Sequence, residues 1–306
     1  MVDSEGERGG PEGTARIRVT HMADPACPWA YSALPAISAL RFRYGGQLDW
    51  RVRTIGLAET TEHYERRGYT PARMAQAPLR FARFGMPFVL APRSRVIATG
   101  RACRAVVAAR LEGEDLGYLA LRALHLAWFT TDLLLDEDGA IEAALAREPA
   151  LDAEAIVARL DEPAVQDAYE RDRSEARTAA GSPAALQEKT ARTDGPERYT
   201  APTLIFEANG RRLEAGGHQP LAAYDVLVAN LDPELVREPS PSGPLPLLER
   251  FTHGLTTREI AVVLAPRNEE PRDAAAAAAL LELVAEGRAT REPLGGDALW
   301  RPRLAE

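Results

Sequence analysis

Residues 24–31 read "DPACPWAY", and they decide how the surrounding chain folds. The residues before them, "ARIRVTHMA" (15–23), alternate apolar and polar side chains, which predicts a strand. The residues from 28 to 45, "PWAYSALPAISALRFRYG", predict a helix with a kink at Pro35. "LDWRVRTIG" (48–56) alternates again and predicts a second strand. Strand, helix and strand in this order form a βαβ unit, whose two strands run parallel.

The composition is that of a soluble globular protein. The 306 residues are 45% hydrophobic and 27% charged, with a formal net charge of -8. This charge argues against general binding to nucleic acid or to an anionic membrane. We expect residues 1–14 to be a flexible tail, because they lack the apolar segment of a signal peptide.

Membrane insertion and a disulfide framework are both unexpected. The longest stretch without a charged residue, 25–40, is interrupted by prolines and too short to cross a bilayer. Two cysteines do not make a disulfide framework, so we predict a cytoplasmic protein. Lys189 is the only lysine among 37 basic residues, which suggests a bacterial source with a GC-rich genome.

The chain divides by pattern into an α/β part with an insertion and a C-terminal addition. Residues 15–69 and 191–232 carry strand patterns, the latter with two short strands about a turn at Asn209-Gly210. Residues 70–190 carry mainly helical periodicity, so we predict a large helical insertion between the two parts. Residues 233–246 are rich in proline and predict a linker.

Residues 247–306 predict two helices followed by a hairpin that turns at Gly295-Gly296. Thr256 and Glu259 have the spacing of a capping box at the start of the first of these helices. The order resembles a winged-helix module, and a generic α/β appendage is the alternative. The second helix, in 271–287, has one arginine and three acidic residues, whereas contacts to phosphates need cations. We therefore expect no nucleic-acid partner, and packing against the main domain or a second subunit in a homodimer.

Cys27 is the candidate nucleophile. A free cysteine with a pKa near 8.5 is only about 3% ionised at pH 7. Cys27 directly precedes Pro28 at the start of the first helix, where unpaired N–H groups favour an anion. We therefore expect a lowered pKa, and a value of about 6.5 would ionise roughly three quarters of the thiol at pH 7. Trp29 would cover the site with an apolar wall, and a small buried hydrophobic residue is the alternative role for Cys27.

"DPACPW", followed far downstream by "TAPTLIF" (200–206), resembles the DsbA-like branch of the thioredoxin superfamily. That branch includes FrnE-type oxidoreductases, 2-hydroxychromene-2-carboxylate isomerases and kappa-class glutathione transferases. The resemblance implies a thioredoxin-like fold split by a helical insertion. It also implies that Pro202 follows a cis peptide bond and faces the Cys27 sulfur. The backbone of Ala201 would then pair with a bound thiol's peptide, as in strand addition.

Ala30 departs from the family's dithiol pattern, because it stands where a second cysteine would resolve a mixed disulfide. Three functions remain open. In the first, Cys27 acts as a monothiol with glutathione, mycothiol or a protein substrate. In the second, the protein is an isomerase or transferase that depends on such a thiol. In the third, it is a non-catalytic binding module. No tightly bound cofactor and no metal site are expected.

Cys103, His21 and Asp24 are the other residues that bear on the thiol. Cys103 lies on the apolar face of a helical pattern, so we interpret it as structural. His21 and Asp24 flank the end of the first strand and could tune Cys27, or could be satisfied by the backbone.

Lys189, Arg192 and Arg198 precede the predicted cis-proline loop. Their charges would suit the carboxylates of a small thiol ligand, and a solvated loop is the alternative.

Overall fold

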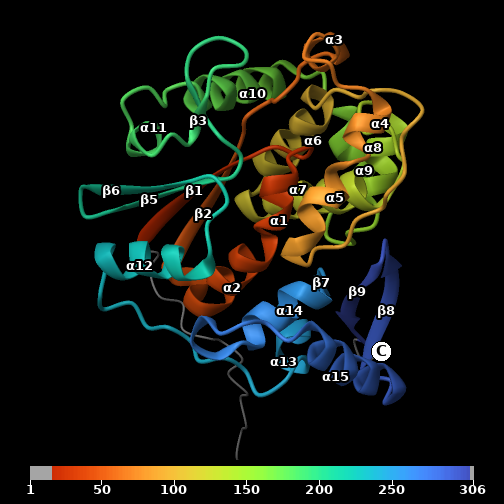
Figure 1. The fold of residues 1–306 in the computed structure, drawn as a ribbon, viewed down its shortest axis with the longest axis vertical. Coiled ribbons are helices and arrows are strands. Elements are labelled where there is room, and N and C mark those ends of the chain that lie inside the picture. The colour runs from red at the N-terminus through yellow and green to blue at the C-terminus, as the bar shows by residue number, and fades with distance from the viewer. Residues whose placement is uncertain (1–15, 304–306) are drawn as a thin grey trace, which may run out of the picture.

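The computed structural model describes residues 16–303, so the tail predicted for residues 1–14 lies outside the described residues. A four-stranded sheet in the order β2-β1-β5-β6 forms its centre (Figure 1). The strands are β1 (Ile17–Ala23), β2 (Leu48–Thr54), β5 (Thr203–Ala208) and β6 (Arg211–Gly216). β1 runs parallel to β2 and antiparallel to β5, which pairs antiparallel with β6. This topology confirms the βαβ unit and the thioredoxin-like fold.

The helix predicted after the first strand is broken in two. α1 (Pro28–Ser32) and α2 (Leu34–Tyr44) meet at Ala33, just before Pro35. Proline has no N–H for the helical ladder, so it is favoured at the first turn of a new helix. α12 (Leu221–Leu231) packs on β5 and β6 and against α2.

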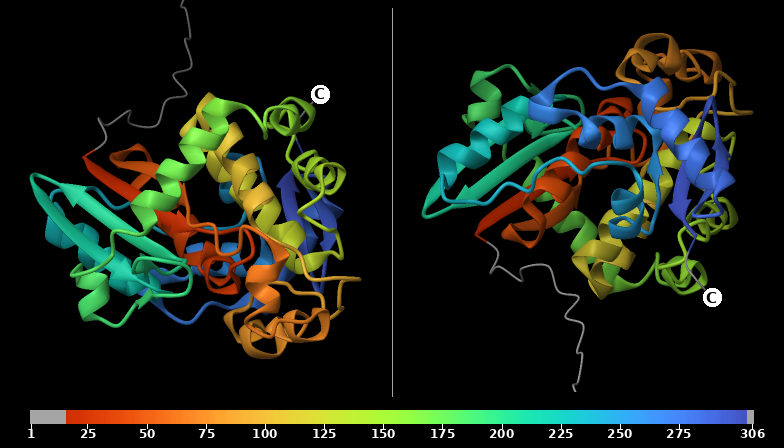
Figure 2. Two further views of the ribbon diagram at one scale, coloured as in Figure 1. Left: turned by 90° about the horizontal axis from the view of Figure 1, so that it is seen from above. Right: turned by 90° about the horizontal axis from the view of Figure 1, so that it is seen from below.

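The segment between β2 and β5 is mainly helical, as predicted. Its longer helices α6, α7 and α10 contact β2, and Figure 2 shows them beside the sheet. The elements of this segment are α3 (Thr61–Glu65), α4 (Pro71–Met74), α5 (Ala77–Phe81), α6 (Gly100–Glu112), α7 (Glu114–Thr130), α8 (Asp138–Leu145), α9 (Ala153–Ala158), α10 (Pro163–Ala176), α11 (Pro183–Leu186) and the short strands β3 (Thr190–Ala191) and β4 (Arg198–Tyr199). Two 3₁₀ turns, Gly45–Gln47 and Ala82–Phe84, precede β2 and follow α5. None of the helices between residues 16 and 303 combines the length and the apolar character needed to span a bilayer.

Residues 245–303 form a C-terminal module with its own sheet, in the order β7-β9-β8. Its elements are α13 (Leu245–Arg250), β7 (Leu255–Thr256), α14 (Thr257–Leu264), the 3₁₀ turn Pro266–Asn268, α15 (Asp273–Ala285), β8 (Ala289–Leu294) and β9 (Asp297–Pro302). α14 begins with the predicted capping box of Thr256 and Glu259, and the hairpin turns at Gly295-Gly296. The order of elements is compatible with the winged-helix-like module suggested by the sequence.

The module is docked on the main domain through a buried ion pair. Arg122 of α7 donates to both carboxylate oxygens of Glu259, at 2.5 and 2.8 Å, and to the carbonyl of Gly254. Ser38 of α2 donates to the same carboxylate at 2.8 Å. Both Arg122 and Glu259 are buried, and α14 packs along α2. The module is therefore continuous with the core of the main domain.

Candidate active site

Cys27 is the N-cap of α1, at the end of the loop that follows β1. Asp24 organises this loop: its carboxylate accepts from the N–H of Ala26 at 3.0 Å and from the N–H of Leu57 at 2.8 Å. The N–H of Cys27 donates to the carbonyl of Asp24 at 3.0 Å. These bonds fix the sulfur at the start of the helix.

The cysteine faces the loop before β5. Its Sγ donates to the carbonyl of Ala201 at 3.0 Å, and the Ala201-Pro202 peptide bond is cis. The two segments are 174 residues apart in the sequence and meet because β1 and β5 are neighbours in the sheet. The thiol and the cis-proline loop therefore share one site.

The expectation of a lowered thiol pKa is wrong for this structure. Cys27 is only 6% exposed, and burial raises the pKa of its thiol to about 12. The N–H groups of Ala30 and Trp29 and the charge of Arg198 act in the opposite direction but do not outweigh burial. The free-energy cost of removing a thiolate from water exceeds the stabilisation that the partial positive charge at the helix N-terminus provides. In this conformation the sulfur is a protonated hydrogen-bond donor.

Cys103, Asp24 and His21 are all buried. Cys103 is fully buried, and its sulfur lies 3.5 Å from a carboxylate oxygen of Asp24. Burial also raises the pKa of Cys103 and that of Asp24. His21 is buried, and neither of its ring nitrogens has a hydrogen-bond partner among the described residues. The Asp24 charge raises the pKa of Cys27.

A pocket of about 640 Å³ opens beside Cys27. Aromatic side chains line much of it: Trp29, Tyr64, Tyr69, Phe81, Phe88, Trp128 and Phe129. The charged residues that line it are all arginines: Arg67, Arg73, Arg80, Arg93 and Arg198. The site therefore combines a thiol, flat apolar walls and positive charge.

Four of these arginines, all but Arg198, form no ion pair with a carboxylate within residues 16–303. Arg80 lies over the Trp29 ring, 5.1 Å from its centroid, and Arg73 lies 4.8 Å from the Tyr69 centroid. Arg93 donates to the carbonyls of Leu133 and Thr131 near the end of α7. An uncompensated cluster of guanidinium groups favours an anionic ligand.

Arg198 has a different setting. It is buried and donates to Tyr199, Thr193 and Asp194, so it is held in place next to the thiol. Lys189 and Arg192 do not line the pocket; Arg192 is largely exposed and pairs with Glu197 at 2.7 Å. Of the three cations that precede the loop, only Arg198 lines the pocket.

The remaining arginines of the pocket were missed by the sequence reasoning. A signal was present, because no Asp or Glu occurs between Glu65 and Glu112. That stretch is rich in arginine and aromatic residues, but its helical periodicity predicts an insertion and does not indicate a site. The sequence pattern does not indicate that α4 and α5 line the pocket beside Cys27.

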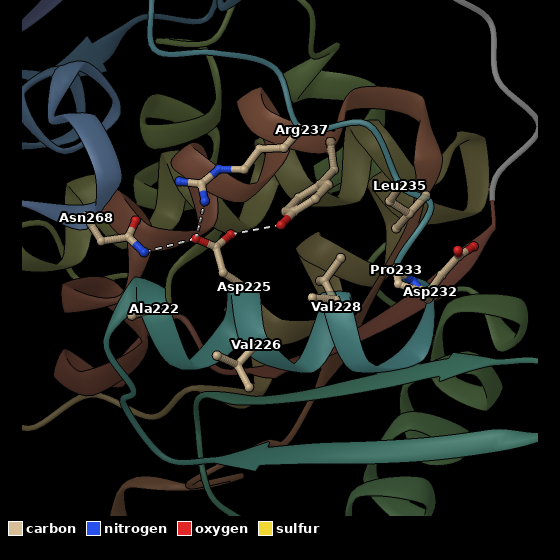
Figure 3. Close-up of a pocket in the computed structure, with 11 residues that line it drawn as sticks. Ala222, Asp225, Val226, Val228, Asp232, Pro233, Leu235, Arg237 and Asn268 are labelled. Atoms are coloured by element: carbon tan, nitrogen blue, oxygen red, sulfur yellow. Dashed lines mark hydrogen bonds and ion pairs between the residues drawn. The ribbon is translucent and has the colours of Figure 1, made fainter.

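A second pocket of about 430 Å³ lies beside α12 (Figure 3). Its carboxylate, Asp225, accepts from Arg43 at 2.5 Å, from Tyr44 at 3.0 Å and from Asn268 at 3.1 Å, and Arg237 lies within 3.5 Å. This carboxylate is satisfied by structural partners. The Cys27 pocket is thus the better candidate for chemistry.

Comparison with known families agrees with this site. The family model described as "DSBA-like thioredoxin domain" matches residues 18–192, more than half of the chain. The chain belongs to the DSBA-like thioredoxin domain family. The match covers Cys27 and the helical insertion, whereas the cis-proline loop and the C-terminal module lie beyond it.

Solved structures share the fold. A candidate protein disulfide isomerase from Nitrosomonas europaea is 17% identical, with a TM-score of 0.51 over 70% of this chain and 97% of its own. The cytosolic disulfide reductase DsbM from Pseudomonas aeruginosa is 21% identical, with a TM-score of 0.49 over 70% of this chain and 99% of its own. No curated protein matches the sequence. At 17% identity, the likeness to the Nitrosomonas europaea structure concerns the fold alone.

Proposed function

We propose that the protein is a DsbA-like thiol-disulfide oxidoreductase that works with Cys27 as a single thiol and takes an anionic low-molecular-weight thiol as partner. The observation that carries the proposal is the position of the sulfur, at the start of α1, against Ala201 and beside a pocket whose charged residues are all arginines. Ala30 leaves no second sulfur at the resolving position. The family membership supports the reaction class.

The exchange needs two thiol partners. The Cys27 thiol loses its proton to solvent, and the thiolate attacks one sulfur of a small disulfide RSSR. A bond forms between Cys27 and one RS group, while the other leaves as RS⁻. The thiolate R′S⁻ of a different thiol then attacks the mixed disulfide at the RS sulfur, forming the new disulfide RSSR′ and releasing the Cys27 thiolate. We assign this exchange to the cytoplasm, where small thiols are kept reduced.

Because the pKa of Cys27 is raised, the proposed reaction needs the pocket arginines to bring the disulfide to the thiol. A thiol with a pKa of about 12 is rarely ionised at neutral pH, so a dilute disulfide would react slowly. Guanidinium groups raise the local concentration of an anionic disulfide. Glutathione, with its two carboxylates, fits this charge better than the uncharged sugar portion of mycothiol.

The test is formation of the mixed disulfide with glutathione disulfide, followed by intact mass. We expect one glutathione per chain, none in Cys27→Ser, and an unchanged amount in Cys103→Ser.

Arg80→Ala should slow the reaction several-fold at low salt, and added salt should shrink the difference in rate between this variant and the wild-type protein. Arg83→Ala is the matched control, because Arg83 lies over the Phe84 ring at 4.9 Å but does not line this pocket. A thiol that stays unmodified in the wild-type protein would contradict the proposal and favour a binding module.

A thiol-dependent isomerase or transferase is the second candidate. The observation that favours it is the protonated Cys27, which could donate a hydrogen bond to the thiolate of a bound cofactor in a pocket large enough for a further substrate. Such an enzyme would need added thiol for turnover and would show no net redox change. Retention of that activity in Cys27→Ser, whose hydroxyl also donates, would separate it from disulfide exchange.

A further inference from the structure

The segment from Gly85 to Val89 lies between the active-site helix and the C-terminal module. On one side, Tyr31 of α1 donates to the carbonyl of Pro87 at 2.6 Å. The Phe88 ring meets the Tyr31 ring edge to face, with centroids 5.1 Å apart. Phe88 is also one of the residues that line the Cys27 pocket. This segment is thus a wall of the thiol site.

On its other side, the same segment is held by the C-terminal module. The hydroxyl of Thr256 lies 3.6 Å from the sulfur of Met86. A Cβ atom on Gly295, in the β8-β9 turn, would lie 3.1 Å from the carbonyl oxygen and 3.3 Å from the carbonyl carbon of Phe88. A Cβ on Gly85 would meet the side chain of Arg258 in α14. Three parts of the module therefore contact this one wall.

The C-terminal module that contacts this segment is itself held in place by ion pairs. Arg122 and Glu259 anchor α14 in the core, and Glu292 of β8 pairs with Arg147 of the main domain and with Arg301 of β9. A wall that is packed against a rigid support cannot yield when a bulky ligand enters. The position of Phe88 is therefore determined by residues more than 150 positions further along the chain.

We propose that the C-terminal module sets the width of the Cys27 pocket, by holding Phe88 against Tyr31 through the turn at Gly295, and so selects thiol partners by size. The inference rests on the proposed function, because it concerns which disulfides reach Cys27. It gives the module a role in specificity that an appendage or a nucleic-acid-binding unit would not have. Gly295 is a positioning residue in this scheme, and Phe88 is the residue that meets the ligand.

The test compares two reagents in a Cys103→Ser background, where Cys27 is the only thiol. Dithiobis(nitrobenzoate) is a bulky anionic aromatic disulfide, and methyl methanethiosulfonate is small and uncharged. Gly295→Ala should push the Phe88 backbone toward Tyr31 by a few tenths of an ångström. We expect the ratio of the bulky to the small reagent's rate constant to fall by roughly threefold or more. Phe88→Ala should raise the same ratio, which keeps the inference testable should Gly295→Ala fold poorly.

Two glycines of the module serve as controls. Gly287 has a similar left-handed backbone, with φ +72 against +55 at Gly295, but its Cβ would have no neighbour closer than 3.9 Å. Gly296 lies in the same turn, and its Cβ would meet nothing within 4 Å. Gly287→Ala and Gly296→Ala should leave the ratio unchanged. An equal ratio in Gly295→Ala and Gly287→Ala, or no change in Phe88→Ala, would overturn the inference while leaving monothiol exchange intact. A Cys27 that reacts with neither reagent would overturn the proposed function and this inference with it.

Discussion

At the scale of single residues, burial decides the chemistry of the site. Cys27 has the helix N-terminus that favours a thiolate, yet its pKa is raised because the sulfur is removed from water. His21 follows the same rule with the opposite sign, since burial lowers the pKa of its imidazole to about 3. The charges of His125 and Arg41 lower it further. Both groups are held in their neutral forms by the fold.

The buried His21 predicts a loss of stability in acid. The unfolded chain binds a proton at this histidine below pH 6.5, whereas the folded protein does so only near pH 3. The free energy of unfolding should therefore fall as the pH drops from 6.5 toward 3, by about 2 kcal/mol at pH 5 from this group. His21→Leu removes the group, and the difference between pH 7 and pH 5 should shrink by that amount in urea denaturation. The same variant should be no less stable at pH 7, because it also removes two unpartnered ring nitrogens. An unchanged pH dependence would show that His21 binds a proton equally well in the folded and unfolded states.

At the scale of elements, the insertion and the module are positioned by polar contacts that span the chain. α14 begins with a capping box, as local sequence predicts, but the same Glu259 also accepts from Arg122 and Ser38. One carboxylate thus caps the start of α14 and joins α14 to α2 and α7. The local signal identifies the first role only.

The Arg122–Glu259 pair predicts a strongly non-additive pair of substitutions. Arg122→Met leaves a buried carboxylate without its counter-charge and should lower the free energy of unfolding by about 3–5 kcal/mol. Glu259→Met should cost at least as much, because the capping of Thr256 is lost as well. The double variant should be less destabilised than the sum of the single variants, by 1 kcal/mol or more as an order of magnitude. Urea denaturation of the four proteins measures this coupling. Additive effects would mean that the two side chains do not depend on one another in the folded protein.

At the scale of the whole molecule, charge is distributed unevenly. The chain carries a net charge of -8, while the Cys27 pocket is lined by arginines as its only charged residues. The exposed part of α15, where a winged-helix module would contact DNA, carries Glu282 and no cation. Arg272 precedes the helix, and Arg258 of α14 pairs with its Asp273. The charged residues that line the thiol pocket are all arginines, whereas α15 itself carries none.

This distribution predicts that the protein does not bind duplex DNA. Contacts to phosphates release counterions and need cations on the docking surface, which α15 lacks. Fluorescence anisotropy with a random labelled duplex should show no binding at micromolar protein, even at low salt. Binding that weakens steeply as salt is added, with a slope that indicates several phosphate contacts, would contradict this prediction. The predicted homodimer is a separate question, which sedimentation of the same sample would answer.

The sequence by itself determined what depends on neighbours along the chain. Alternation and periodicity identified β1, β2, the break before Pro35, the capping box of α14 and the final hairpin, because backbone propensities and side-chain periods act within a few residues. It also identified Cys27 at a helix start and the absence of a second sulfur at Ala30. Tertiary structure alone decided that burial outweighs the helix terminus at Cys27, that Arg198 reaches the pocket while Lys189 and Arg192 do not, and that the C-terminal module supports the wall at Phe88. Desolvation and packing depend on atoms brought together from distant parts of the chain, and no local pattern encodes which parts those are.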